Sequence, residues 1–424
     1  MRIWYNQAMA RSLKRERVKT AMSLWKKRKR MTGFWVGFLL VLSAIFFAAC
    51  APKGAKNWLF SIGPQTNSVA LGDLENDGDL DAFLANGENE VPVPDTVWLN
   101  DGTGHFQDSG QQIAEYESHS VILADMDADG NLDAITGGTS GVVIYFNNGQ
   151  AVFAKGQARL TPQRDLWAYI LAPAVGDVNG DGWLDVLAGG CCGAVEQWDD
   201  GRQQVHPSHD ALWISDGKGH YTDSGQEFDV LGTNAVAFGD LDSDGDLDAF
   251  FANTGVDKPQ ADSIWLNDGH GGFMLSSQVL GEGLGEAVVL GDLDQDGDLD
   301  AVVGNYKADE LWINLGGRQG RTQGEFTLAG HLGEGPRTRA LSLPDVDGDG
   351  DQDVLAVGED QAVIWTNDGL ARFTAGQEFS FEPQHALAMG DVNGDGSVDV
   401  FAGSVNHGIL VWLNDGEGGF TKEP

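Results

Sequence analysis

The chain has 424 residues, of which 64 are acidic and 26 are Lys or Arg, and the two kinds of charge are unevenly distributed. Residues 1–50 hold 11 of the basic residues and one of the acidic residues, so residues 51–424 carry a formal net charge of −48. This strong negative charge excludes binding of residues 51–424 to nucleic acid or to anionic lipid, because both kinds of binding need a cationic surface. Only three cysteines are present, which excludes a disulfide framework.

The basic head is typical of an export signal. A cluster of Lys and Arg at 26–30 precedes an uncharged apolar run at 32–49 that ends at Cys50. The segment resembles a bacterial lipoprotein signal, which implies that residues 1–50 direct export, that Cys50 is lipidated after cleavage, and that residues 51–56 form a short tether. An uncleaved membrane anchor is the alternative, because the run approaches spanning length. Either interpretation places residues 51–424 outside the cytoplasm, at the outer membrane or cell surface. If the segment is a lipoprotein signal, the protein contacts the membrane through its lipid anchor only.

Beyond the tether, an acidic nine-residue pattern, D-x-[DEN]-x-D-G-x-x-D, recurs at intervals of about fifty residues. Its seven copies begin at Asp73, Asp125, Asp177, Asp240, Asp292, Asp345 and Asp391. A period of this length is typical of one repetitive body and not of several unrelated domains. We therefore predict a single domain over residues 57–424.

The pattern has the chemistry of a calcium loop. Calcium takes six to eight oxygen ligands, and alternating carboxylates at positions 1, 3 and 5 of a tight loop can face one ion while a glycine at position 6 makes the turn. Position 7 varies, as expected for a residue that offers its backbone carbonyl, and position 9 is always Asp. The alternative is a set of solvated acidic turns that hold no ion.

We expect up to seven calcium ions in all. The predicted ligands, by loop, are Asp73, Glu75, Asp77, Asp79 and Asp81; Asp125, Asp127, Asp129, Asn131 and Asp133; Asp177, Asn179, Asp181, Trp183 and Asp185; Asp240, Asp242, Asp244, Asp246 and Asp248; Asp292, Asp294, Asp296, Asp298 and Asp300; Asp345, Asp347, Asp349, Asp351 and Asp353; and Asp391, Asn393, Asp395, Ser397 and Asp399. An EF-hand is excluded because position 12, where that motif has a bidentate Glu, is apolar, as in Leu84 of the first loop and Phe251 of the fourth.

Each loop lies between segments with the two-residue period of β-strands. Small and large apolar residues alternate at 68–73, 234–240 and 286–292, and a second, a third and a fourth strand follow each loop before the next repeat. Four strands and a loop every fifty residues indicate a propeller blade. The pattern resembles the FG-GAP or VCBS repeats of bacterial surface proteins and integrin α subunits, which implies an all-β, seven-bladed β-propeller with calcium loops between the first and second strands of each blade.

Two further features bear on this ring. The last repeat ends soon after Phe420, so we predict that residues 57–63 supply the outer strand of the last blade and leave no long edge exposed. One strand position is aromatic in every repeat. We interpret these aromatic side chains as packing between neighbouring blades, and a ligand-binding aromatic cluster is the alternative. The residues are Trp98, Tyr145, Trp213, Trp265, Trp312, Trp365 and Trp412.

Differences between repeats indicate where a specific function would lie. The third repeat carries the longest insertion between its second and third strands, with Cys191, Cys192, Trp198, His206 and His209. We expect a ligand-binding loop on the face opposite the calcium loops. A zinc site and a vicinal disulfide that stiffens the loop remain alternatives.

A second candidate is the residue six positions before each leading Asp, which we expect at one mouth of the central channel on the same face. This position is polar in six of seven repeats, and Trp167 and Tyr169 lie close by as stacking surfaces for a sugar; its occupants are Asn67, His119, Leu171, Asn234, Glu286, Arg339 and His385. Ordinary solvated strand entry is the alternative.

Motifs for catalysis are scarce: no Gly-x-Ser-x-Gly, His-Glu-x-x-His or phosphate loop is present. Among propellers of this kind some are polysaccharide lyases, so a propeller-type polysaccharide-degrading enzyme, with His119 or His385 as base, is the alternative function, and a purely structural envelope scaffold is a third. The sequence favours an exported, calcium-binding surface module for adhesion, binding a glycan or a protein.

Overall fold

The computed structural model describes residues 65–423 apart from 88–92, 114–116, 139–140, 162–168, 192–193, 198–202, 207–208, 229–231, 256–258, 317–319, 321–323, 334–336, 382–385 and 405–406. All of these described residues belong to one compact unit, residues 63–424. Within them every regular element is a strand. They include no helix with the length and apolar character needed to cross a membrane.

In the described part of the chain, thirty strands form seven four-stranded antiparallel sheets and one extra hairpin. The first four sheets are β1 (Gln65–Gly72), β2 (Asp81–Gly87), β3 (Asp95–Asn100) and β4 (Phe106–Ile113); β5 (Ser118–Ala124), β6 (Asp133–Gly138), β7 (Gly141–Asn147) and β8 (Phe153–Leu160); β9 (Tyr169–Gly176), β10 (Asp185–Cys191), β13 (Ala211–Ser215) and β14 (Tyr221–Asp223); and β15 (Thr233–Gly239), β16 (Asp248–Asn253), β17 (Ser263–Asn267) and β18 (Phe273–Leu275).

The other three sheets are β19 (Gly285–Gly291), β20 (Asp300–Asn305), β21 (Asp309–Asn314) and β22 (Phe326–Leu332); β23 (Ala340–Ser342), β24 (Val354–Val357), β25 (Gln361–Thr366) and β26 (Thr374–Ser380); and β27 (Ala386–Gly390), β28 (Asp399–Ser404), β29 (Gly408–Asn414) and β30 (Phe420–Lys422). The extra hairpin pairs β11 (Ala194–Gln197) with β12 (Gln203–His206).

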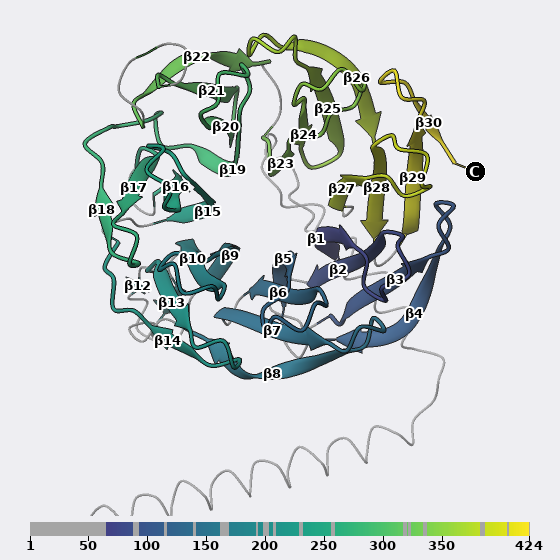
Figure 1. The fold of residues 1–424 in the computed structure, drawn as a ribbon, viewed down its shortest axis with the longest axis horizontal. Coiled ribbons are helices and arrows are strands. Elements are labelled where there is room, and N and C mark those ends of the chain that lie inside the picture. The colour runs from purple at the N-terminus through teal and green to yellow at the C-terminus, as the bar shows by residue number, and fades with distance from the viewer. Residues whose placement is uncertain are drawn as a thin grey trace, which may run out of the picture. The chain divides into compact units, whose positions relative to one another are not determined.

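The seven sheets are arranged as blades around a common centre, with the first strand of each blade innermost (Figure 1). We number the blades one to seven in chain order. Contacts between β1 and β27 bring the first blade beside the last, so the ring is closed. The predicted seven-bladed, all-β propeller is confirmed.

The seventh blade differs from the sequence prediction. Its outer strand is β30, which pairs with β29 through three residue pairs from Trp412↔Lys422 to Asn414↔Phe420. The expectation that the last repeat is too short to make an outer strand is therefore wrong: a three-residue strand is sufficient, as it is for β14 and β18. Residues 57–63, which we expected to fill this place, lie outside the described residues.

The core consists of apolar clusters that neighbouring blades share. Tyr145 of blade two, for example, packs with Leu74, Phe83 and Val97 of blade one, and Trp265 of blade four packs with Leu187 of blade three. All seven repeated aromatics lie in such clusters with the preceding blade. The prediction that they pack blade against blade is confirmed.

A repeated asparagine reinforces the same boundaries. An asparagine is the last residue of the third strand in five blades and directly follows that strand in blade six, and its Nδ2 donates to the carbonyl at loop position 2 of the preceding blade over 2.7–2.9 Å. Asn100 of blade one donates to Val392 of blade seven, which ties the two ends of the ring together. Blade three has Ser215 in this position.

Replacing Asn100 with Ala is expected to destabilise the calcium-loaded protein by about 2–4 kcal/mol. The change removes donors to the Val392 and Leu80 carbonyls and an acceptor for the Gly104 amide, and it leaves buried polar groups without partners. Chemical denaturation measures the loss. Asn148→Ala is the matched control, because Asn148 is exposed and should change stability by less than about 0.5 kcal/mol; equal losses in the two variants would contradict the prediction.

Candidate functional site

The seven acidic loops join the first and second strands of each blade and have one conformation. The residue at position 2 is apolar and almost fully buried in every loop, which anchors the loop to the core. Position 6 is a glycine whose φ lies between +89° and +100°, a region that residues with a Cβ rarely adopt. A burial anchor and an obligatory glycine explain why seven differing sequences fold alike.

Backbone amides organise the carboxylates of each loop. The Asp at position 1 accepts a hydrogen bond from the glycine amide at position 6 in all seven loops. The Asp at position 5 accepts one from the amide at position 7. These bonds hold the side chains in place against their mutual repulsion.

The Asp at position 9 is fully buried and connects the loop to the third strand. In Asp300, for example, Oδ2 accepts from the Leu293 amide at 3.0 Å and Oδ1 accepts from the Asn314 amide at 2.9 Å. The equivalent pair of bonds is present in every blade. This residue therefore has a structural role in addition to its place in the loop.

Positions 1, 3 and 9 converge. In four loops one carboxylate oxygen from each of these positions lies within 4.8 Å of the other two, namely in Asp125, Asp127 and Asp133; Asp240, Asp242 and Asp248; Asp292, Asp294 and Asp300; and Asp345, Asp347 and Asp353. The other three loops have Glu75, Asn179 or Asn393 at position 3. Three oxygens at this separation can face one cation.

The electrostatics of the loops disfavour negative charge when no cation is present. Burial, with neighbouring carboxylates as a further cause, raises the pKa of Asp300 to about 8 and that of Asp133 to about 7. Burial and the Asp296 carboxylate raise the pKa of Asp298 to about 7. Asp298 is 3% exposed, and neither of its carboxylate oxygens has a hydrogen-bond partner among the residues that the structure describes.

These observations fit a hard divalent cation. The donors are all oxygens, the carboxylates crowd together, and buried oxygens of Asp79, Asp242 and Asp298 have no hydrogen-bond partner within the loops. Calcium prefers such a donor set, whereas zinc and copper prefer nitrogen or sulfur. The residues of the acidic loops therefore fit the calcium ions that the sequence predicts.

The opposite face carries the differences between blades. Because the strands of a blade alternate in direction, the connections between second and third strands lie at the end away from the acidic loops. The insertion of blade three forms the β11–β12 hairpin at this end. Trp198 and Cys192 lie outside the described residues, as do Trp167 and His385, and so do the side chains of Tyr169, Cys191 and His206.

The remaining candidates for a ligand face are distributed over several blades. His119 is the second residue of the inner strand of blade two and is half-buried, and burial lowers the pKa of its imidazole. His209 lies just before β13 in blade three, while Arg339 is exposed in blade six and pairs with Glu359. Cys50 lies outside the described residues.

Other members of the predicted channel ring connect neighbouring blades. Asn67 donates to the Ser118 carbonyl of blade two at 2.7 Å, and Asn234 donates to the Gly285 carbonyl of blade five at 2.9 Å. Glu286 pairs with Arg337 at 2.5 Å, across the boundary between blades five and six. Much of the polarity at this position thus serves the ring itself.

A second set of buried carboxylates on this face was not predicted. Asp95 accepts bonds from the Asn86 amide at 2.7 Å and from the Ser118 hydroxyl of the next blade at 2.9 Å. Asp210 and Asp309 bond in the same way to Thr233 and Thr338. Asp95 and Asp309 are the first residues of their third strands, and Asp210 directly precedes one. Each stands three residues before the repeated tryptophan, a spacing that could have found them in the sequence.

Comparisons with known proteins agree with this description. A family model described as FG-GAP-like repeat matches residues 73–136, 125–188, 240–303 and 345–401. A search of curated proteins found no match. Among solved structures, BBS1N in complex with ARL6DN has a TM-score of 0.54 at 12% identity and covers 84% of this chain and 94% of that chain.

A lectin of Agrocybe aegerita, described as recognising non-reducing terminal N-acetylglucosamine, has a TM-score of 0.48 at 19% identity. The match covers 80% of this chain and 85% of the lectin chain. At such identities the likeness to solved structures concerns the fold alone.

Proposed function

Because the chain belongs to the FG-GAP-like repeat family, we propose that it is an exported, calcium-stabilised β-propeller that binds a glycan or protein ligand on the face opposite its calcium loops. The observation that carries this proposal is the structural difference between the two faces of the propeller. The loop face repeats one acidic arrangement in every blade, whereas the opposite face holds the β11–β12 hairpin and connections of differing length.

Calcium is supported by the donor set. Side-chain oxygens at positions 1, 3, 5 and 9, with the carbonyl at position 7, would hold the ion in each loop. When bound, it would supply two positive charges to a cluster whose members are otherwise driven towards protonation. Seven ions would reduce the charge of −48 on residues 51–424 to about −34.

Export is supported by the sequence of the head. A basic cluster, an apolar run and Cys50 are arranged as in lipoprotein signals. Attachment by a lipid at Cys50 would place the acidic propeller outside the cytoplasm, where calcium is abundant enough to occupy weak sites. The body would then meet glycans and proteins of its surroundings through its variable face.

The proposal is tested by probing a glycan array with the full chain in calcium and in chelator. In a trimmed variant, a two-glycine turn replaces residues 192–208, which removes most of the insertion and retains Asp210. The control variant shortens the blade-one connection between Gly87 and Asp95 instead. Calcium-dependent binding that is lost only in the trimmed variant is the expected result.

Binding that survives the trimming would place the ligand elsewhere on the propeller. A folded, calcium-loaded protein that binds no glycan would contradict the glycan ligand, and crosslinking to envelope proteins would then test the protein ligand. The thermal stability of each variant, measured in calcium, shows whether the trimmed chain is still folded.

A further inference from the structure

The seven acidic loops, numbered with their blades, differ in how many carboxylates they hold. At positions 1, 3, 5, 7 and 9, loops one, four, five and six have five acidic residues each and loop two has four, whereas loops three and seven have only three. Positions 3 and 7 are Asn179 and Trp183 in loop three, and Asn393 and Ser397 in loop seven. The affinity of a calcium loop is tuned by the number of charged ligands. These two loops are therefore expected to bind the ion most weakly.

The asparagines at position 3 also supply a hydrogen bond that the other loops lack. Asn179 Nδ2 donates to Oδ2 of Asp181 at 3.1 Å. In the same way, Asn393 Nδ2 donates to Oδ2 of Asp395 at 2.9 Å. The other oxygen of each Asp accepts from the backbone amide at position 7. Both oxygens of the position-5 carboxylate thus have partners within the loop, and a cation that engages Oδ2 has to replace an existing hydrogen bond.

In the other five loops position 3 is acidic, and an ionised carboxylate there has no hydrogen to donate to position 5. It repels the neighbouring carboxylates instead. Among the described residues, buried oxygens of Asp79 in loop one, Asp242 in loop four and Asp298 in loop five have no hydrogen-bond partner. Within the same described residues, no side-chain oxygen of loops three and seven is buried without a partner. Loops three and seven therefore gain less from an ion.

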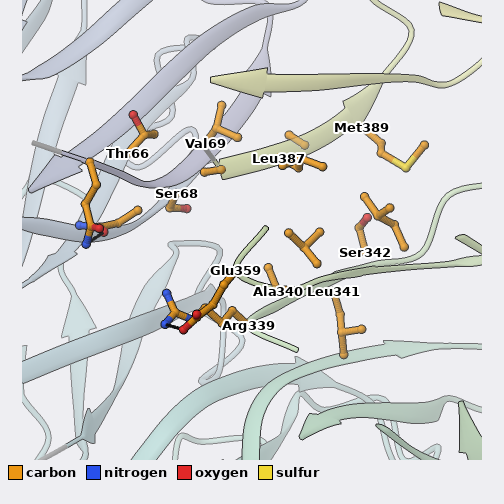
Figure 2. A pocket seen from close by; sticks show the side chains of 17 residues that line it. Thr66, Ser68, Val69, Arg339, Ala340, Leu341, Ser342, Glu359, Leu387 and Met389 are labelled. Carbon is orange, nitrogen blue, oxygen red and sulfur yellow. Dashed lines mark hydrogen bonds and ion pairs between the residues drawn. The ribbon is translucent and has the colours of Figure 1, made fainter. Parts of the chain in front are cut away.

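Loop seven lies where the ring closes. The carbonyl of Val392, at position 2 of this loop, accepts a hydrogen bond from Asn100 of blade one at 2.8 Å. The inner strand β27, which leads into loop seven, borders a cavity of about 390 Å³ together with β1 and β23, and Leu387 and Met389 line it (Figure 2). Packing contacts are missing on this side of the strand. Blade seven therefore depends on its loop and on the Asn100 bond more than a fully packed blade would.

Loop three belongs to the blade that carries the long insertion. Its Asp185 accepts from the Val178 amide within the loop at 3.2 Å and from the Ser215 amide at the end of β13 at 2.8 Å. β13 is the strand that follows the β11–β12 hairpin in the chain. An ion in loop three thus acts on the strand to which one end of the insertion is attached.

From these differences we propose that loops three and seven are low-affinity calcium sites, which fill at higher calcium concentrations than the other five loops. The inference rests on the proposed calcium binding and states how that binding is regulated. At low calcium the protein holds five ions. As the concentration rises, two further ions tighten blade three and the seam between blades seven and one. The insertion and the ring closure thereby respond to the calcium concentration of the surroundings.

Isothermal titration calorimetry of the full chain with calcium tests the proposal. Two classes of site are expected, five tight sites and two that are at least about ten-fold weaker. In the double variant Asn179→Asp with Asn393→Asp the weak class should disappear, whereas in Asp127→Asn it should grow to three, because loop two then has the composition of the weak loops. Seven equivalent sites in the unchanged protein, or a weak class that persists in the double variant, would overturn the proposal. A chain that binds no calcium at all would overturn the proposed calcium binding as well, which distinguishes the two failures.

Trp183 allows loop three to be followed by itself. No other loop has an aromatic residue among its nine positions. Terbium luminescence that is lost in Trp183→Phe therefore reports the ion of loop three. In a terbium titration this signal is expected only after five ions have bound, and Asn179→Asp should bring it forward. Asn148→Asp is the matched control, because it adds the same charge at an exposed turn outside the loops and should leave the signal late. A Trp183 signal that rises with the first ions in the unchanged protein would overturn the proposal.

Discussion

Removal of calcium with a chelator is expected to lower the thermal midpoint of the protein by about 25 °C. Each ion that binds only the folded state contributes about 2.7 kcal/mol when its free concentration is a hundred times its dissociation constant. Seven such sites contribute about 19 kcal/mol together. With about 2.1 cal mol⁻¹ K⁻¹ of unfolding entropy per residue, a body of residues 63–424 would melt about 25 °C lower.

The loops give this expectation its physical basis. Without cations the position-9 carboxylates are buried among other carboxylates, and burial drives the pKa of Asp300 to about 8. Differential scanning calorimetry in calcium, in chelator and after calcium is restored measures the effect. A melt that chelation leaves unchanged would contradict calcium binding in the loops, and recovery with magnesium at equal concentration would contradict the preference for calcium.

Between pH 6 and pH 8, the stability of the calcium-loaded protein is expected to fall, and replacing Asp95 with Asn should remove about 2–3 kcal/mol of that fall. Burial raises the pKa of Asp95 to about 8, from an ordinary value of 3.8. A carboxyl whose pKa is raised in the folded state contributes stability that is complete below its unfolded pKa. That contribution is lost as the pH rises through the folded pKa.

The substitution Asp95→Asn mimics the protonated acid, because the amide can still accept from the Asn86 backbone and donate to the Ser118 hydroxyl. Urea denaturation at a series of pH values in saturating calcium measures the slope. Asp108→Asn is the control, since Asp108 is exposed on β4 and should leave the slope unchanged. Parallel slopes for Asp95→Asn and the unchanged protein would refute the assignment.

The sequence predicted those parts of the fold that the same physical requirement produces in every blade. Seven glycines at loop position 6 and seven aromatics on the third strand each reflect one steric or packing requirement that every blade must meet. Periodicity in the sequence then reports a periodic structure. The residues of the loops could be assigned to positions for the same reason.

What could not be predicted depends on contacts between distant residues. Asn100 looks like a turn residue in the sequence, and only the closed ring shows that its amide reaches Val392. Nothing next to Asp95 in the sequence shows that its carboxylate accepts a hydrogen bond from the Ser118 hydroxyl of the next blade.

The bond between Asn100 and Val392 also has a consequence for the order of folding. Its two residues are 292 positions apart, so the seam between the first and last blades forms only after nearly the whole chain is available. The other asparagine bonds span 68 to 89 residues and can form as each blade is added. Loop closure over so long a span is entropically slow, and we expect the final seam to limit the folding rate while the earlier blades assemble in sequence.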